Sequence, residues 1–182
     1  MKRQKKESGK QKAGKRRSIL AGICNLVSVL SLLAVVAVCI PMTVPGLLGY
    51  DAYTVISGSM EPAIPTGSAI YVETVPPEQV AVGDVIAFYS RGAVITHRVA
   101  ENLVVTGEFI TKGDANAEND VTPAAYESLM GRVAFSIPFL GNVMAVCSGT
   151  AGKVYLACGV VGAVLLQLAG SLFRADRDEK DR

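Results

Sequence analysis

The 182-residue chain has little of the material from which metal sites and disulfide scaffolds are built. It contains one histidine, four cysteines and no tryptophan. A single imidazole leaves little for a zinc site, and four cysteines are too few for a disulfide framework in a chain of this length. The composition therefore predicts neither a metal nor another cofactor.

Basic residues are scarce in the middle of the chain. Residues 41–153 carry five Lys or Arg against eleven Asp or Glu, a formal charge of −6. Residues 1–17 have the opposite bias, with nine Lys or Arg against one acid, Glu7. A nucleic-acid-binding domain needs basic charge in its folded part, so the sequence excludes nucleic acid as a partner.

Two long stretches have no charged residue. Ser18–Ile40 has 23 residues, and as a helix it would be roughly 34 Å long, enough for a hydrocarbon core of about 30 Å. We expect Pro41 and Pro45 to end this helix. A cleavable signal peptide is the alternative, but its apolar region is usually only about 7–15 residues. Val154–Phe173, interrupted only by Gln167, predicts a second membrane span.

The basic residues before the first span predict the topology. Positive charge is retained in the cytoplasm, so residues 1–17 form a cytoplasmic tail, expected to be a disordered arm with some affinity for membrane lipid. Residues 18–40 and 154–173 then span the membrane. Residues 41–153 form an extracytoplasmic domain, and residues 174–182 form a second cytoplasmic tail.

The extracytoplasmic domain is predicted to be mainly β. Short runs rich in Val, Ile, Thr and aromatic residues alternate with Gly and Pro turn signals. The predicted strands are Tyr53–Ser57, Ala69–Thr74, Val85–Tyr89, Ala93–Val99, Leu103–Thr106 and Phe109–Lys112. We expect a hairpin around Ser90-Arg91-Gly92 and another before Phe109, within a compact antiparallel sheet or small barrel. Ile137–Val146 is either a last strand or a segment at the membrane interface.

The first stretch that can carry chemistry is Ser57-Gly58-Ser59-Met60-Glu61-Pro62, directly after a predicted strand. A serine on a turn beside glycine exposes its hydroxyl, which becomes a nucleophile when a base takes its proton. Its own N–H can point at a developing oxyanion. Taken alone, the motif is a common turn.

The second stretch is Thr96-His97-Arg98-Val99, in a predicted strand. Imidazole has an ordinary pKa near 6.5, which suits a general base at neutral pH. A lone histidine is more often structural, but a serine hydrolase that used histidine would have no other candidate here.

The third stretch is the turn-rich segment Lys112–Asp120, KGDANAEND. Asp114 and Asp120 can each orient an imidazole or brace the loop, as in an Asx turn. A calcium loop is the other interpretation. The segment lacks the glycine expected at the sixth position, where Asn119 stands, and the glutamate expected at the twelfth, where Ala125 stands.

Together these stretches resemble signal peptidase I, and in particular its Ser–His branch, found in the endoplasmic reticulum, archaea and some Gram-positive bacteria. The resemblance covers about residues 50–141 and includes SGSMEP, GDVIAF, THRV, KGDANAEND and IPFLG, together with the flanking anchors. The larger bacterial branch has lysine where this chain has His97. Lys112, the one lysine in the core of the domain, lies in the Gly-Asp segment and not at that position.

The resemblance implies a role for each matched residue. Ser59 would be the nucleophile, His97 the base, and Asp120 the acid that orients His97. Asp114 would be a supporting carboxylate, although either aspartate remains a candidate for the triad, with Asp120 favoured. The Ser59 N–H and the Ser57 hydroxyl would form the oxyanion hole.

The implied partner is the signal peptide of an exported preprotein, cleaved after small residues at positions −1 and −3. An extended peptide can add as a strand to the edges of Tyr53–Ser57 and Ala93–Thr96, so that alternate side chains face the enzyme. Shallow apolar pockets would then be lined by Val55, Ile56, Met60, Ile64 and Ile95. The alternative for these five residues, and above all for Val55 and Ile64, is that they belong to the core.

Three other functions are compatible with parts of the sequence. One is a non-catalytic membrane-anchored β module for adhesion or assembly. A sortase-like transpeptidase would need an exposed cysteine, and Cys147 lies in an apolar stretch. An inactive relative of the peptidase would not be expected to retain Ser59, His97 and Asp120 together.

Overall fold

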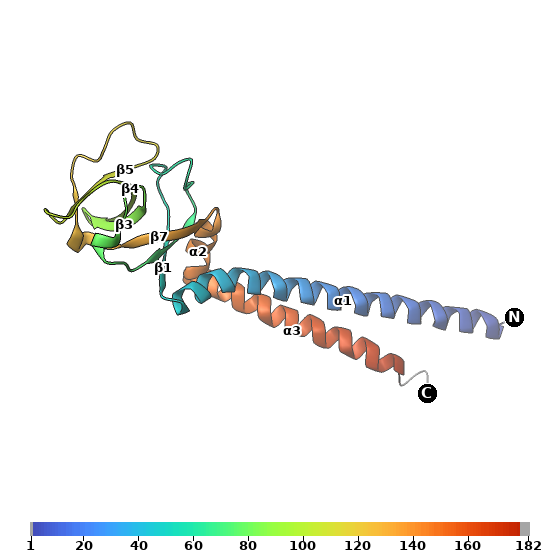
Figure 1. Ribbon diagram of the computed structural model, residues 1–182. Helices are drawn as coiled ribbons and strands as arrows, with labels where there is room; N and C mark the ends of the chain where they lie inside the picture. Colours follow the sequence, from blue (N-terminus) through green and yellow to red (C-terminus); the bar gives the residue numbers. More distant parts are fainter. Residues whose placement is uncertain (1, 179–182) are drawn as a thin grey trace. The chain divides into compact units, whose positions relative to one another are not determined.

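The computed structural model describes residues 2–178 and contains two compact units (Figure 1). One comprises residues up to 39 and from 150 onward, and the other comprises residues 40–149. The predicted tails extend to Met1 and to residues 179–182, which lie outside the described residues.

The first unit consists of two long apolar helices. Helix α1 spans Lys2–Leu47 and helix α3 spans Thr150–Asp178, and they lie side by side (Figure 1). The buried Ser28 hydroxyl donates to the Ala163 carbonyl at 2.8 Å. The stretches Ile19–Leu47 and Thr150–Leu172 are long and apolar enough to cross a membrane, and only 6% and 11% of their most apolar windows are buried. Core helices of a soluble protein would bury far more, so both fit membrane spans.

Helix α1 differs from the prediction at both ends. It begins at Lys2, so the basic arm expected to be disordered is helical, as its Lys, Arg, Gln and Ala residues favour. It also continues through both prolines to Leu47. Because Pro45 has no N–H, the Pro41 carbonyl lacks its helical donor. The buried Tyr71 replaces that donor, its hydroxyl donating to Pro41 O at 2.7 Å.

The second unit is built on one antiparallel sheet of seven strands, which confirms the predicted mainly β class. Its order is β1-β2-β7-β3-β4-β5-β6. The strands are β1 (Tyr50–Thr54), β2 (Ala69–Glu73), β3 (Val85–Ser90), β4 (Ala93–Leu103), β5 (Glu108–Lys112), β6 (Ala124–Ala125) and β7 (Leu129–Ile137). Short 3₁₀ turns lie at Pro77–Gln79 and Tyr126–Ser128, and helix α2 spans Leu140–Ser148.

The hairpin predicted around Arg91 is confirmed. Phe88 pairs with Ile95, Tyr89 with Val94, and Ser90 with Ala93. Arg91 and Gly92 form the two-residue turn, and both have positive φ, as the tight turn between right-twisted strands requires.

The predicted break between Ala93–Val99 and Leu103–Thr106 is wrong, because β4 is one strand. Its register with β5 shifts between Val99 and Glu101, so a bulge accommodates the polar stretch that the pattern indicated as a gap. Residues 104–107 form the turn into β5, and the residues before Ser57 form β1 three positions earlier than predicted.

Besides the two-residue strand β6 and the two 3₁₀ turns, two longer elements were not predicted. The first is β7, which lies between β2 and β3 and pairs with both. Its sequence contains Gly131 and Arg132, and its stability comes from these distant partners more than from a local pattern. The second is α2, so a strand over Ile137–Val146 is wrong. Gly141 is the second residue of this helix, and a Cβ there would lie 2.3 Å from the Ser68 carbonyl oxygen, so glycine allows the close packing.

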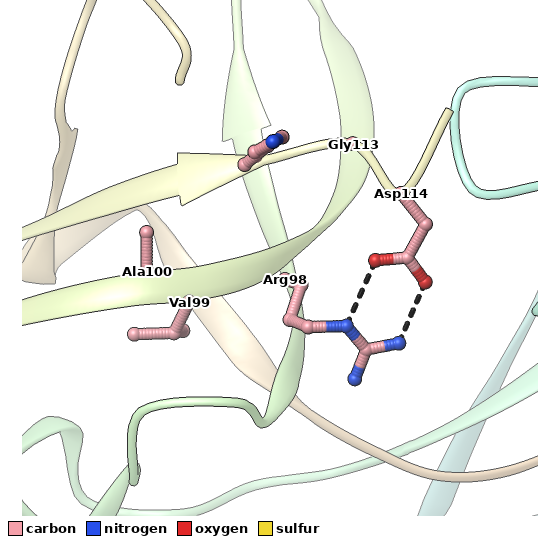
Figure 2. Close-up of a pocket in the computed structure, with 6 residues that line it drawn as sticks. Arg98, Val99, Ala100, Gly113 and Asp114 are labelled. Atoms are coloured by element: carbon pink, nitrogen blue, oxygen red, sulfur yellow. Dashed lines mark hydrogen bonds and ion pairs between the residues drawn. The ribbon is translucent and has the colours of Figure 1, made fainter. Parts of the chain in front are cut away.

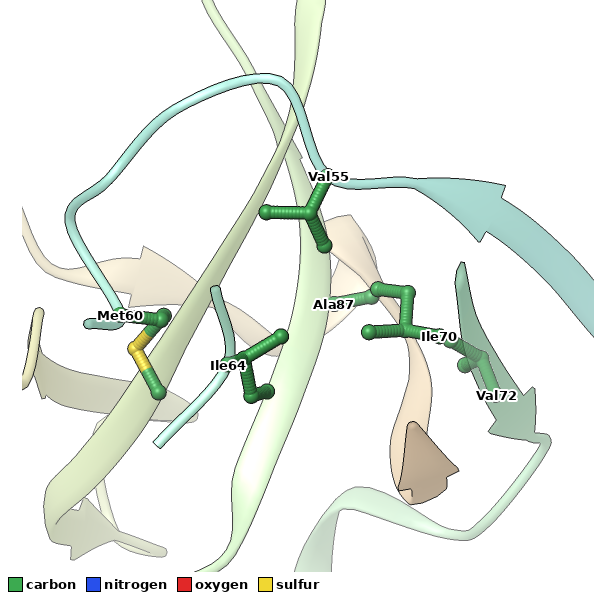
Figure 3. Close-up of a cluster of buried hydrophobic side chains, with 6 residues drawn as sticks. All are labelled: Val55, Met60, Ile64, Ile70, Val72 and Ala87. Carbon is green, nitrogen blue, oxygen red and sulfur yellow. The ribbon is translucent and has the colours of Figure 1, made fainter. Parts of the chain in front are cut away.

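Two hydrophobic clusters stabilise the sheet. One gathers Val55, Met60, Ile64, Ile70, Val72 and Ala87 around β1, β2 and the loop between them (Figure 3). The other gathers Val80, Ile86, Phe88, Val99, Phe109 and Ala124 around β3, β4 and β5. The segment between β1 and β2, which carries Met60 and Ile64, is therefore held on a buried apolar base.

We expect Tyr71→Phe to reduce the stability of the sheet unit by about 1–2 kcal/mol. The phenyl ring can keep its stack on Phe135, but the Pro41 carbonyl loses its donor. Thermal unfolding of the full chain in detergent measures the change. Tyr89→Phe, at a tyrosine that is 57% exposed, is the matched control. Equal stability of the two variants would contradict the role of Tyr71.

Candidate active site

The Ser57–Pro62 loop leaves β1 and is anchored by buried apolar side chains. Met60 and Ile64 are 1% and 5% exposed, and the Ile64 amide donates to the Met60 carbonyl at 2.8 Å. Between these anchors and β1, the hydroxyl oxygens of Ser57 and Ser59 lie 3.4 Å apart at the surface. The loop thus presents two neighbouring hydroxyls on a fixed base.

The five residues predicted to line substrate pockets lie in different environments. Val55, Met60 and Ile64 are buried in the cluster of Figure 3, as the core interpretation of these residues expected. Ile95 is half-buried against the second cluster. Ile56 is 87% exposed. Of the five, Ile56 is therefore the most accessible.

His97 lies on β4 and contacts Asp120. The distance from His97 Nδ1 to Asp120 Oδ2 is 2.5 Å, and His97 is buried. A carboxylate oxygen without a proton can only accept, so in that arrangement Nδ1 is the donor and Nε2 is the ring nitrogen that faces away from this bond. The Phe88 ring also packs against the imidazole in a T-shaped arrangement, with ring centroids 6.5 Å apart.

Asp120 has a second donor that the sequence reasoning missed. The hydroxyl of Thr111, on β5, donates to the same Oδ2 at 2.6 Å, and Thr111 is fully buried. The Asp120 amide in turn donates to the Thr111 carbonyl at 2.8 Å. The only sequence signal for Thr111 was its position in the strand before the Gly-Asp segment, where a threonine is common.

The loop from Gly113 to Asp120 contacts both the serine loop and His97. At its start, the Ala115 amide donates to the Ser59 carbonyl at 2.9 Å, and at its end Asp120 contacts His97. A Cβ on Gly113 would lie 2.6 Å from the Ser59 oxygen, so glycine allows this approach. Within residues 2–178, the hydrogen bond of Ser59 Oγ is to Ser57 and not to His97.

Asp114 contacts Arg98 and not the imidazole. Its carboxylate accepts two hydrogen bonds from the guanidinium, 2.8 Å from Nε and 2.6 Å from Nη2 (Figure 2). These bonds lower the pKa of Asp114, although burial acts in the opposite direction. The ion pair therefore fastens the start of the loop to β4.

Positive charge is concentrated beside Asp114, on the face of the β4–β5 pair opposite His97. Arg98 pairs with Lys112 across β4 and β5, and like charges in this position repel. Asp114 lies beside both cations, which help to keep it ionised. Together with Val99, Ala100 and Gly113, these three residues line a pocket of about 270 Å³ (Figure 2).

Comparison with known proteins relates part of this chain to a curated bacterial protein. No protein-family model matches the chain. Signal peptidase I W from Bacillus subtilis (strain 168) is 36% identical over 100 residues, which are 52% of this chain and 52% of that protein. The resemblance to signal peptidase I is confirmed. The chain spans about half the length of this curated relative, so the similarity to signal peptidase I concerns part of each protein.

We expect Asp114→Asn to lower stability in a pH-dependent way. The pKa of Asp114 is lowered in the folded state, so its contribution is complete above the unfolded-state pKa of about 3.9 and is lost as the pH falls through the lowered value. The Arg98 side chain is 38% exposed, so solvent screening limits the loss at pH 7 to about 1 kcal/mol.

Chemical denaturation of the full chain between pH 3 and pH 7 measures this difference. Asp51→Asn, at an exposed aspartate on β1, is the control and should change stability little. A deficit of Asp114→Asn that stays constant over the whole pH range would contradict the ion-pair account.

Proposed function

We propose that this chain is a membrane-bound serine endopeptidase, a signal peptidase I, that cleaves N-terminal signal peptides from exported preproteins. The observation that carries the proposal is the arrangement around residues 113–120. One loop contacts the main chain of Ser59 at its start and the imidazole of His97 at its end. The similarity to signal peptidase I W supports the same reaction.

In the proposed reaction, Ser59 Oγ attacks the carbonyl carbon of the residue at position −1. The Ser59 hydroxyl turns from Ser57 toward His97, and Nε2 of the neutral imidazole takes its proton. The imidazolium then gives this proton to the nitrogen of the leaving amine as the peptide bond breaks. The same nitrogen then takes a proton from water as the water attacks the ester on Ser59, and it returns this proton to Ser59 Oγ as the signal peptide is released.

Asp120 stabilises the imidazolium in both steps. Its contact with Nδ1 is short enough for a charge-assisted hydrogen bond, which strengthens when the ring becomes positive. The contact also fixes the tautomer, so that Nε2 is the atom available to Ser59. Asp114, held by Arg98, would act on the loop rather than on the imidazole.

The oxyanion of the tetrahedral intermediate would be stabilised by the Ser59 N–H and the Ser57 hydroxyl. Ser57 Oγ lies 3.4 Å from Ser59 Oγ, so it is close to the carbon that Ser59 attacks. When Ser59 turns to His97, the Ser57 hydroxyl becomes able to donate to the developing charge.

Two strand edges are suited to bind an extended peptide. Residues 93–97 of β4 pair with β3 alone in the described part of the chain, because pairing with β5 begins at Arg98. Strand β1 lies at the edge of the sheet. A preprotein added as a strand would present alternate side chains to the enzyme, and we propose that Ile56 and Ile95 help to select small residues at positions −1 and −3.

The two apolar helices would hold this site at the membrane surface. We propose that residues 41–153 form an extracytoplasmic catalytic domain, with both termini in the cytoplasm, because the basic residues 1–17 precede the first span. Enzyme and membrane-bound preprotein would then share one bilayer, which raises their effective concentration.

The cleavage experiment uses the full chain in proteoliposomes with a preprotein carrying an Ala-x-Ala site. We expect cleavage by the wild type and a loss of about 10³-fold or more for Ser59→Ala and for His97→Ala. Ser57→Ala should lose about 10²–10³-fold, since it removes one oxyanion donor. Ser136→Ala, on β7, is the matched control and should retain full activity.

Two results would overturn the proposal. Cleavage by Ser59→Ala would show that Ser59 is not the nucleophile. No cleavage by a folded wild-type chain would instead favour a non-catalytic membrane-anchored module.

Gly113→Ala tests the contact between the loop and the serine. The added methyl group would lie 2.6 Å from the Ser59 carbonyl oxygen, so we expect the serine loop to shift and kcat to fall by about 10²-fold. Gly149→Ala is the control, because its methyl group would meet only an ordinary contact at 3.6 Å. Equal kcat values for these two variants would show that the contact has no part in positioning Ser59.

A further inference from the structure

Thr111 and His97 share one acceptor atom. Oδ2 of Asp120 lies 2.5 Å from His97 Nδ1 and 2.6 Å from Thr111 Oγ1. A hydroxyl always carries a proton to donate, and an ionised carboxylate oxygen can accept from two donors. The carboxylate is thus held from β4 and from β5 at the same oxygen.

The register of the sheet explains why Thr111 is in this place. Thr111 pairs with Val99, and Val99 is two residues after His97, so all three side chains lie on one face. The loop after β5 then returns, and the Asp120 amide donates to the Thr111 carbonyl. A single residue therefore holds both the main chain and the side chain of Asp120.

The fold itself does not require the hydroxyl. Thr111 is a fully buried position in a paired strand, where valine has the same shape and a comparable preference for strands. Within the described residues, the hydrogen bond of Thr111 Oγ1 is the one to Asp120. Burying a hydroxyl is unfavourable unless it has such a partner, so its presence here points to the carboxylate.

We propose that Thr111 is a positioning residue for the His97–Asp120 pair, an inference that rests on the proposed peptidase function. Its hydroxyl fixes the rotation of the Asp120 carboxylate, so that Oδ2 faces Nδ1 throughout the reaction. It also donates to the oxygen that accepts from Nδ1, so the carboxylate keeps this orientation when the imidazole becomes positive. Thr111 touches neither the substrate nor the reacting atoms.

Two substitutions distinguish a positioning role of the Thr111 hydroxyl from a role of the side chain in core packing. Thr111→Val keeps the shape and removes the hydroxyl, whereas Thr111→Ser keeps the hydroxyl and removes a buried methyl group. We expect kcat of Thr111→Val to fall about 10- to 100-fold with KM unchanged and with a melting temperature close to wild type. Thr111→Ser should keep kcat within about 3-fold of wild type although it is less stable.

The histidine itself gives a second measurement, independent of turnover. Since His97 is the only histidine in the chain, ¹⁵N-histidine labelling of the full chain in detergent gives the signals of one imidazole. The Nδ1 proton bound to Asp120 should resonate far downfield in the wild type and in Thr111→Ser. In Thr111→Val it should move upfield or disappear through exchange with water.

The outcomes distinguish failure of this inference from failure of the proposed function. If the wild type cleaves and Ser59→Ala does not, a fully active Thr111→Val with an unchanged Nδ1 proton overturns the role of Thr111 alone. Activities that follow the order of stability, with Thr111→Ser below Thr111→Val, overturn it as well. If no variant cleaves but the Nδ1 proton depends on the Thr111 hydroxyl, the positioning of the pair stands and the peptidase function fails.

Discussion

The hydrogen bond between His97 and Asp120 is the interaction on which the candidate site depends. It joins a side chain from the middle of a paired strand to one at the end of a loop, 23 residues away. Such a bond persists only if both ends are held, because ordering a loop costs conformational entropy. The strand holds His97 through β3, and the Thr111 carbonyl and hydroxyl hold Asp120.

The loop from Gly113 to Asp120 connects the His97–Asp120 pair with Arg98 and with the serine loop. Arg98 fastens its start through Asp114, and the Ala115 amide binds the Ser59 carbonyl. The serine is therefore placed by its main chain, which leaves its hydroxyl able to rotate. The apolar cluster under the serine loop supplies rigidity from below, since packed side chains resist displacement.

Local patterns predicted those parts of the fold that local forces decide. The hairpin at Arg91-Gly92 follows from turn chemistry, and the two long apolar helices follow from length and hydropathy. Strand β7 and the bulge near Ala100 escaped prediction because distant strands stabilise them. Pro45 did not end α1, because the Tyr71 hydroxyl, from β2, satisfies the carbonyl that the proline leaves without a donor.

The sequence by itself determined the order of the candidate residues, the mainly β class and the two apolar helices, because each can be recognised from neighbouring residues. Only the tertiary structure decided that Asp120, and not Asp114, contacts His97, and that Thr111 joins them. It also placed Met60 in the core and not in an exposed pocket. The physical reason is that burial and side-chain contact arise when distant segments pack, and the spacing of residues along a chain does not specify them.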